Sequence, residues 1–314
     1  MSRLPQFRGG RRKGRVLIVE GGGMRGAFTG GALAAMAHEY PARNFDLVVG
    51  VSSGSCAAVY YVTEPPGDSL AIHRFLQVWR FELNGSKLMS YLNLLRGRQF
   101  LDQNYLIDEL FGKKYPVKRE RLNQKGITPL YVVASNMKTL EPEYIKATSE
   151  NLFTLLKAAT SLPIATRGRR TLGRDEYTDG GVMDPLPVQA VIDAGYEDIT
   201  VILTTPRYHV HRPIGKLLSR IAYPRHKGVA HKLNRHMHVQ HAKSYDLVNN
   251  PPKGVRMRVI DPQHTLPAQM LDTNILLLNH TVDMGMQAAY EALSNTRQPR
   301  GWWQFLKRIW LRPA

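Results

Sequence analysis

Short apolar runs, separated by glycine, proline and charged residues, recur along the first two thirds of the chain. Residues 15–20 form one such run, and after a glycine-rich turn a stretch of small and apolar residues, 27–40, contains no proline. The first pattern is typical of a strand buried on both faces, and the second predicts a helix. Residues 46–49 and 54–62 repeat this order. We therefore predict a three-layer α/β/α fold with a mainly parallel central sheet.

Later parts of the chain continue the alternation of strands and helices. Residues 143–147 alternate in polarity, which is typical of an edge strand. The remaining predicted strands are 130–134, 199–203 and 255–260, and the predicted helices are 70–80, 104–111, 151–159, 187–194 and 272–293.

Composition divides the chain into four parts. A basic N-terminal arm, 1–14, precedes a core of alternating predicted strands and helices, 15–205, and a basic, histidine-rich, mainly helical part, 206–295, is expected to pack on that core. An amphipathic tail, 296–314, ends the sequence. The 314 residues are 43% hydrophobic, enough for a folded core, and a single cysteine excludes an internal disulfide framework.

The net charge of +18 favours partners that are polyanions, either nucleic acid or an anionic lipid surface. Between residues 206 and 258, twelve Lys/Arg accompany one acid, Asp246. This segment could be a solvated helical face, a metal site or a cationic surface that receives anionic lipid. The mixed spacing of its histidines, among interleaved cations, argues against metal. These histidines are His209, His211, His226, His231, His236, His238 and His241.

A glycine-rich turn follows the first predicted strand and fits the dinucleotide pattern G-x-G-x-x-G. That pattern also needs an acid at the far end of the second strand, whereas Asp46 begins that strand. Exposed backbone N–H groups at a helix start also suit a developing oxyanion. The turn consists of Gly21, Gly22, Gly23, Met24, Arg25 and Gly26.

Residues 50–54 match the nucleophile-elbow pattern G-x-S-x-G between a predicted strand and helix. Ser52 would be the nucleophile, and Gly50 and Gly54 would prevent side-chain collisions at the bend. The alternative is an ordinary serine-glycine turn. Cys56 is expected to be a small buried residue rather than a second nucleophile.

A serine nucleophile needs a base. A histidine would complete a triad, and the candidates are His264, His280 and the cluster within 209–241. The other candidate is Asp179, because Gly180 and Gly181 after it allow a tight bend.

Three motifs in this order, GGGMRG, GVSSG and DGG, resemble those of the patatin-like phospholipases, a family of serine lipid acyl hydrolases. The segments ATSLP at 159–163 and DPLPV at 184–188 strengthen the resemblance, which spans about residues 15–205. It implies that Ser52 is the nucleophile, that Asp179 is the base and that the glycine turn is the oxyanion loop. It also implies cleavage of phospholipid or lysophospholipid esters through an acyl-enzyme, without a metal or other cofactor.

Placed on a helix, the tail has an aromatic face backed by cations, which is typical of a helix in a bilayer interface. The alternative is a helix docked on its own domain. No apolar run predicts a signal peptide or a membrane-spanning helix. We therefore expect a cytoplasmic protein, peripheral on the inner membrane face, whose partners are its lipid substrate and an anionic membrane surface. The alternative function is non-catalytic binding of anionic lipid or nucleic acid, although no nucleic-acid recognition motif supports the latter.

Overall fold

A computed structural model describes residues 3–10, 12–64, 70–85, 87–90, 99–162, 165–166 and 168–294. Within these residues, eight strands form one sheet in the order β5-β6-β3-β2-β1-β7-β8, with β4 pairing to β3 beside this path. Pairing is parallel from β3 to β8 along this order and antiparallel where β4, β5 and β6 join. The strands are β1 (Gly14–Val19), β2 (Leu47–Val51), β3 (Leu130–Asn136), β4 (Pro142–Lys146), β5 (Arg170–Leu172), β6 (Asp175–Asp179), β7 (Tyr196–Ile202) and β8 (Arg256–Ile260).

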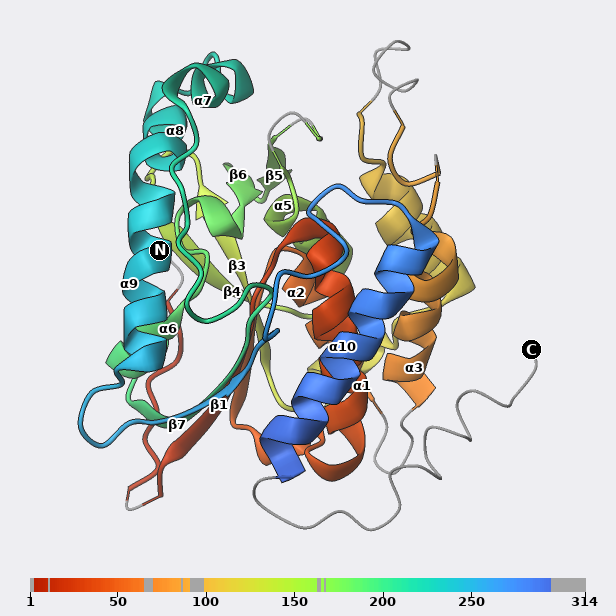
Figure 1. The fold of residues 1–314 in the computed structure, drawn as a ribbon. Coiled ribbons are helices and arrows are strands. Elements are labelled where there is room, and N and C mark those ends of the chain that lie inside the picture. The colour runs from red at the N-terminus through yellow and green to blue at the C-terminus, as the bar shows by residue number, and fades with distance from the viewer. Residues whose placement is uncertain are drawn as a thin grey trace.

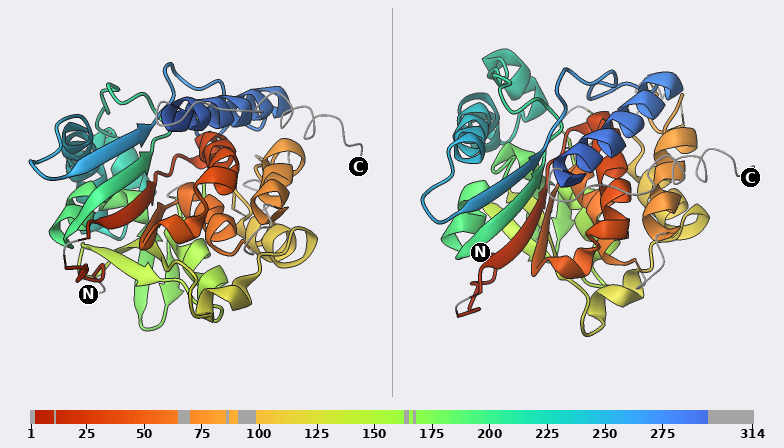
Figure 2. Two further views of the ribbon diagram at one scale, coloured as in Figure 1. Left: turned by 90° about the horizontal axis from the view of Figure 1, so that it is seen from below. Right: turned by 60° about the horizontal axis from the view of Figure 1, so that its bottom comes forward.

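Helices cover both faces of this sheet (Figures 1 and 2). One face carries α1 (Gly26–Glu39), α2 (Ser53–Val62), α3 (Leu70–Gln77), α5 (Leu152–Ala159) and α10 (Ile275–Ser294). The opposite face carries α6 (Val188–Asp193) and α9 (Met237–Asn249). Beyond α9 lie α7 (Lys216–Ala222) and α8 (Lys227–His231). The irregular helices are η1 (Gly23–Arg25), η2 (Ala42–Asn44), η3 (Val78–Glu82), η4 (Tyr105–Lys114), η5 (Arg119–Asn123), η6 (Gly180–Val182) and η7 (Lys232–His236).

Alternation along β1 divides the core into two layers. Leu17 and Val19 belong to the cluster under α1, α2 and α10, whereas Val16 and Ile18 belong to the cluster under α6 and α9. All four side chains are fully buried. A strand that packs on both faces has no polar side, which explains why the sequence shows a continuous apolar run. The three-layer α/β/α prediction, with a mainly parallel sheet, is confirmed.

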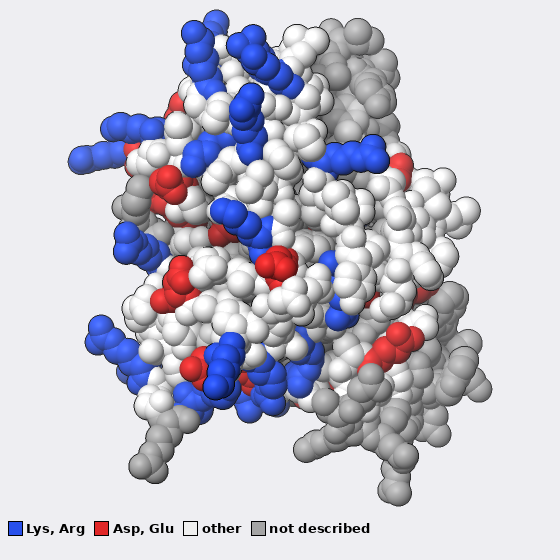
Figure 3. Space-filling view, turned by 60° about the vertical axis from the view of Figure 1, so that its left-hand side comes forward, with Lys and Arg blue, Asp and Glu red and all other residues white. Residues whose placement is uncertain are grey.

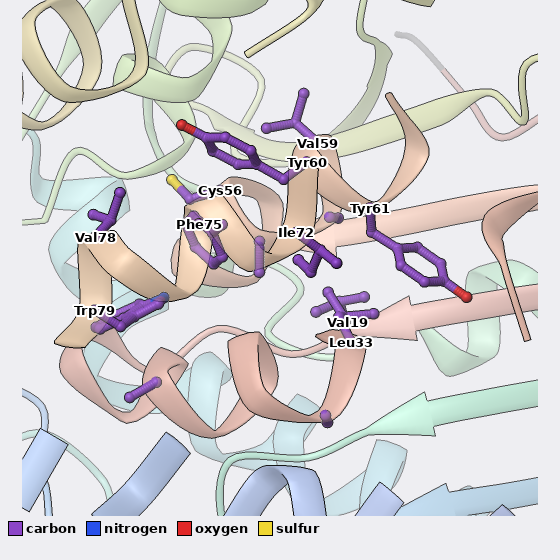
Figure 4. Packing of buried hydrophobic residues seen from close by; sticks show 14 of the residues in the cluster. Val19, Leu33, Cys56, Val59, Tyr60, Tyr61, Ile72, Phe75, Val78 and Trp79 are labelled. Atoms are coloured by element: carbon purple, nitrogen blue, oxygen red, sulfur yellow. The ribbon is translucent and has the colours of Figure 1, made fainter. Parts of the chain in front are cut away.

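An aromatic group fills the space between α2 and α3 (Figure 4). The rings of Tyr60 and Phe75 stack with centroids 4.9 Å apart, and Trp79 on η3 meets Phe75 edge-on at 6.0 Å. Aromatic pairs in these geometries contribute beyond the area that they bury. This group makes a rigid wall beside the amino end of α2, where the candidate nucleophile lies.

The strand β3 lies between β2 and β6. Val51, the last residue of β2, pairs with Val133, and Asp179, the last residue of β6, pairs with the next residue, Ala134. Since β2 is parallel to β3 and β6 is antiparallel to it, the two strands run in opposite directions and end at the same level of the sheet. The register of β3 therefore brings together two chain segments that lie 127 residues apart in sequence.

Several sequence predictions differ from the structure in their details. The predicted helix 70–80 ends in the π-helical turn η3, and the predicted helix 104–111 is the π-helix η4. No strand was predicted at 170–179, because β6 (DEYTD) is polar and pairs over few positions. The predicted long helix 272–293 is the uninterrupted α10. The predicted amphipathic tail, 296–314, lies outside the described residues, as does part of the N-terminal arm. No helix among the described residues is both long and apolar enough to cross a bilayer.

Candidate active site

Ser52 lies at the sharp bend between β2 and α2. Its backbone has φ 49° and ψ −129°, and a positive φ is uncommon for a residue with a side chain. A Cβ on Gly50 would lie 2.7 Å from the Cα of Ser55, and one on Gly54 would lie 2.4 Å from the carbonyl oxygen of Val19. Both positions therefore need glycine for the bend to close against its neighbours.

The bend directs the Ser52 hydroxyl at Asp179. Ser52 Oγ donates to Asp179 Oδ2 at 2.6 Å, and the other carboxylate oxygen accepts from the Gly181 N–H at 2.8 Å. A Cβ on Gly180 would lie 2.2 Å from the Val133 carbonyl oxygen, so the turn after Asp179 can pack directly on β3. Both groups are almost enclosed: Ser52 is 7% exposed and Asp179 is 3% exposed.

Burial raises the pKa of Asp179 to about 6, although the hydrogen bonds from Ser52 and from the Gly181 N–H act in the opposite direction. Within the described chain, no cation forms an ion pair with this carboxylate. A carboxylate with a raised pKa is a stronger base than an exposed aspartate while remaining mostly ionised at neutral pH. The pair is therefore arranged for proton transfer from the hydroxyl to the carboxylate.

The glycine turn lies next to this pair, and a Cβ on Gly21 would lie 2.7 Å from the Cβ of Ser52. Three of its N–H groups are already used inside the protein. Met24 N–H donates to the Met270 carbonyl, Arg25 N–H donates to the Gly22 carbonyl, and Gly26 N–H donates within η1. For the Gly22 N–H, the described residues provide no acceptor. Of the six residues of the glycine turn, Met24, Arg25 and Gly26 therefore have N–H groups that are already engaged, and the unused donors lie toward Gly22 and Gly23.

The Arg25 side chain turns back onto the glycine turn. Its Nε donates to the Gly22 carbonyl oxygen at 3.4 Å, a long hydrogen bond. The side chain also lines the cavity described next.

Two cavities open at Ser52. The wider one, of about 590 Å³, is mostly apolar and contains the glycine turn, Ser52 and Asp179. The narrower one, of about 50 Å³, extends into the core along the aromatic wall. Its apolar lining includes Cys56, Phe75, Trp79, Leu88, Met89, Leu101, Leu106, Phe111 and Leu162. An apolar chain bound in the narrow cavity and a larger group in the wide one would meet at the serine hydroxyl.

A buried carboxylate that the sequence analysis did not single out, Glu20, supports the glycine turn. It accepts from the Thr204 N–H at 2.5 Å and contacts His241 Nε2 at 2.6 Å, while the Thr204 hydroxyl donates to the Gly21 carbonyl oxygen at 2.6 Å. Burial alone would raise the pKa of Glu20, but these partners hold it below its ordinary value. The network joins the end of β1 to β7 and α9. The sequence does contain a hint of this residue, because an acid directly follows an apolar strand and directly precedes three glycines.

No histidine in the described chain hydrogen-bonds Ser52 or Asp179. The triad candidates His264 and His280 are exposed. From the histidine-rich segment, His211 and His241 line the wide cavity and stack with ring centroids 3.6 Å apart. The interpretation of this segment as a uniformly solvated face is therefore wrong for these two residues.

The remaining sequence candidates lie away from the chemistry. Asp46 accepts from Arg12 and from the Arg15 N–H at the opposite end of the sheet, so it cannot complete a dinucleotide site beside the glycine turn. Cys56 is buried, and burial raises the pKa of its thiol to about 12, which disfavours a thiolate nucleophile. In the described part of the chain, no group of His, Cys, Asp or Glu is arranged to hold a metal ion.

Comparison with known proteins gives matches to a family model, a sequence relative and a solved structure. The family model described as Patatin-like phospholipase matches residues 17–192, more than half of the chain. The uncharacterized protein YjjU of Escherichia coli (strain K12) is 25% identical over 278 residues, which cover 87% of this chain and 75% of that protein. The solved structure of VipD from Legionella pneumophila aligns with a TM-score of 0.47 at 12% identity, over 93% of this chain and 70% of that one.

Proposed function

The chain belongs to the patatin-like phospholipase family, and from this premise we propose that it is a serine hydrolase that cleaves acyl esters of lipids. The observation that carries the proposal is the 2.6 Å hydrogen bond from Ser52 Oγ to Asp179, at the junction of two apolar cavities. An apolar cavity can hold the acyl chain of a lipid. A serine whose hydroxyl donates a hydrogen bond to a buried carboxylate can attack the ester carbonyl of that chain.

In the proposed first step, Asp179 takes the Ser52 proton as Oγ attacks the ester carbonyl carbon. The negative charge then develops on the carbonyl oxygen, where the backbone N–H groups of Gly22 and Gly23 can donate to it. The positive end of α2 faces the same point, because Ser53 begins that helix. Collapse of this intermediate breaks the ester bond, and Asp179 returns the proton to the departing alkoxide.

The second step removes the acyl group from Ser52. Asp179 takes a proton from a water molecule as the water oxygen attacks the acyl carbonyl, and Ser52 Oγ leaves and regains a proton. The same oxyanion donors serve both steps. Histidine is not needed, because the raised pKa of Asp179, about 6, lets one carboxylate act as base and then as acid near neutral pH.

We assign the acyl chain to the narrow cavity and the rest of the lipid to the wide one. The narrow cavity has an apolar, partly aromatic lining and ends in the core, as a hydrocarbon chain requires. The wide cavity carries the polar groups, with Arg25, Arg212, His211 and His241 on its walls. A phospholipid or lysophospholipid would place its glycerol and headgroup there.

The test is to incubate the purified full chain with phospholipids, lysophospholipids and diacylglycerols and to quantify the fatty acids released. We expect release from the wild type and a loss of about 10³-fold or more in Ser52→Ala. Ser55→Ala is a matched control, since Ser55 lies one turn into the helix that Ser52 precedes and its hydroxyl has no hydrogen-bond partner among the described residues. Equal release by wild type and Ser52→Ala would show that Ser52 is not the nucleophile.

A further inference from the structure

Large apolar side chains stand exposed around the mouth of the wide cavity. On α7, Leu217, Leu218 and Ile221 are 74%, 50% and 60% exposed. In the turn before α10, Met270 and Leu271 are 45% and 48% exposed. Leu218, Met270 and Leu271 also line the cavity, so both groups belong to its rim. Contiguous exposed apolar groups on a soluble domain usually mark an interaction site.

The packing of α7 explains why its leucines point outward. The helix is held by Ser219, which is 1% exposed, and by Ala222, which packs against the small apolar cluster around Tyr223 and Leu233. Leu217 and Ile221 contribute to no core cluster within the described residues. The helix therefore buries its small residues and presents its large aliphatic ones to the solvent.

Cations lie along the α7 side of this apolar rim. Residues 212–227 carry five Lys/Arg and no Asp or Glu. Figure 3 shows Lys and Arg side chains gathered at the end of the molecule that α7 and α8 form. In the described chain, none of the five makes an ion pair: Arg212, Lys216, Arg220, Arg225 and Lys227. The nearest acid along the rim turn, Asp272, accepts from the Gln269 N–H.

Building on the proposed function, we propose that the rim formed by α7 and residues 270–271 docks on an anionic lipid bilayer. Leu217, Leu218, Ile221, Met270 and Leu271 enter the interface, and the five cations meet the lipid phosphates. The wide cavity then opens directly onto the bilayer, so that an acyl ester can reach Ser52 without crossing water. A nucleic acid would leave the aliphatic residues without a partner, and a second copy of this basic end would be repelled by its own charge.

The experiment uses the full chain with Ser52→Ala, so that the vesicles stay intact. Co-sedimentation is measured with phosphatidylcholine vesicles, with and without phosphatidylglycerol. We expect binding to the anionic vesicles, weakened at least about tenfold by Leu217→Ser/Ile221→Ser and by Lys216→Glu/Arg220→Glu. A matched control near the opposite end of the sheet, Lys125→Glu/Lys146→Glu, should bind within about twofold of the parent.

A second measurement separates docking from catalysis. With Ser52 restored, the α7 variants should hydrolyse a soluble short-chain ester, p-nitrophenyl butyrate, at the wild-type rate, because neither pair lines the cavity. Vesicle binding that none of the α7 variants weakens would overturn the docking proposal, even where the soluble ester is cleaved. Wild-type dimers that Leu217→Ser/Ile221→Ser converts to monomers, without vesicle binding, would also overturn it. Vesicle binding that the α7 variants weaken, without hydrolysis of any ester by the wild type, would support the docking surface and contradict the proposed function.

Discussion

Replacing Asp179 with Asn should abolish activity and yet stabilise the protein at neutral pH. Burial raises the pKa of this carboxyl from 3.8 to about 6, which corresponds to about 3 kcal/mol of unfavourable free energy when it is ionised in the folded state. The Asn amide has a similar shape and carries no charge. Its oxygen can accept from the Gly181 N–H, and its NH₂ group can donate to Ser52 Oγ. The substitution therefore removes the catalytic base, and it also removes the unfavourable free energy of burying an ionised carboxylate.

The pH dependence gives this prediction a distinctive signature. Because the folded pKa lies above the unfolded one, the folded wild type binds more protons between about pH 4 and pH 6, so its stability falls as the pH rises through that window. The amide introduced by Asp179→Asn does not titrate. The stability difference should therefore be below about 1 kcal/mol near pH 4 and reach about 3 kcal/mol in favour of Asp179→Asn at pH 7.

Urea denaturation at a series of pH values, beside an ester-hydrolysis assay, measures both effects. Asp193→Asn is a matched control, because it removes an exposed carboxylate that accepts from Gln189 on its own helix. Its stability change should stay within about 0.5 kcal/mol at every pH. If Asp179→Asn were less stable than wild type at pH 7, or kept its esterase activity, a buried catalytic carboxylate would be the wrong account of this residue.

The acidity of Asp179, the shape of the narrow cavity and the Glu20 network give three further predictions. The kcat/KM for ester hydrolysis should fall about tenfold per pH unit below about pH 6, as Asp179 becomes protonated, and a profile that is flat down to pH 5 would contradict this. Leu106→Trp should fill the narrow cavity and lower hydrolysis of p-nitrophenyl palmitate at least about tenfold, while butyrate hydrolysis changes by about twofold or less. Equal losses on both esters would place the acyl chain elsewhere. His241→Leu should leave Glu20 buried without its ring partner and cost about 3 kcal/mol in urea denaturation, and an unchanged midpoint would contradict that.

The sequence predicted the sheet because β1, β2, β3 and β7 are buried on both faces and leave continuous apolar runs. The strand β6 left no such trace, since its residues are polar and the first two of its five residues are only partly buried. Asp179 was still singled out as a candidate, because the glycines after it form a motif even though the strand before it does not. Its distance from Ser52 depends on the register of β3, which no local pattern encodes.

The parts of the site that the sequence did not reveal depend on contacts between distant segments. Glu20 and His241 meet across 221 positions of the chain, and neither belongs to a motif that predicts the other. The Met270 carbonyl oxygen accepts a hydrogen bond from the Met24 N–H, which leaves fewer free donors in the glycine turn. Since every residue has a backbone carbonyl, this contact carries no signature in the side chains.

The claim that Ser52 is a nucleophile activated by Asp179 is tested most directly by covalent labelling with a fluorophosphonate, followed by peptide mass spectrometry. The adduct should lie on Ser52 in the wild type, and it should form at least about a hundredfold more slowly in Asp179→Asn, which lacks the base. An adduct on another residue, or equally fast labelling of Ser52 in Asp179→Asn, would contradict the account.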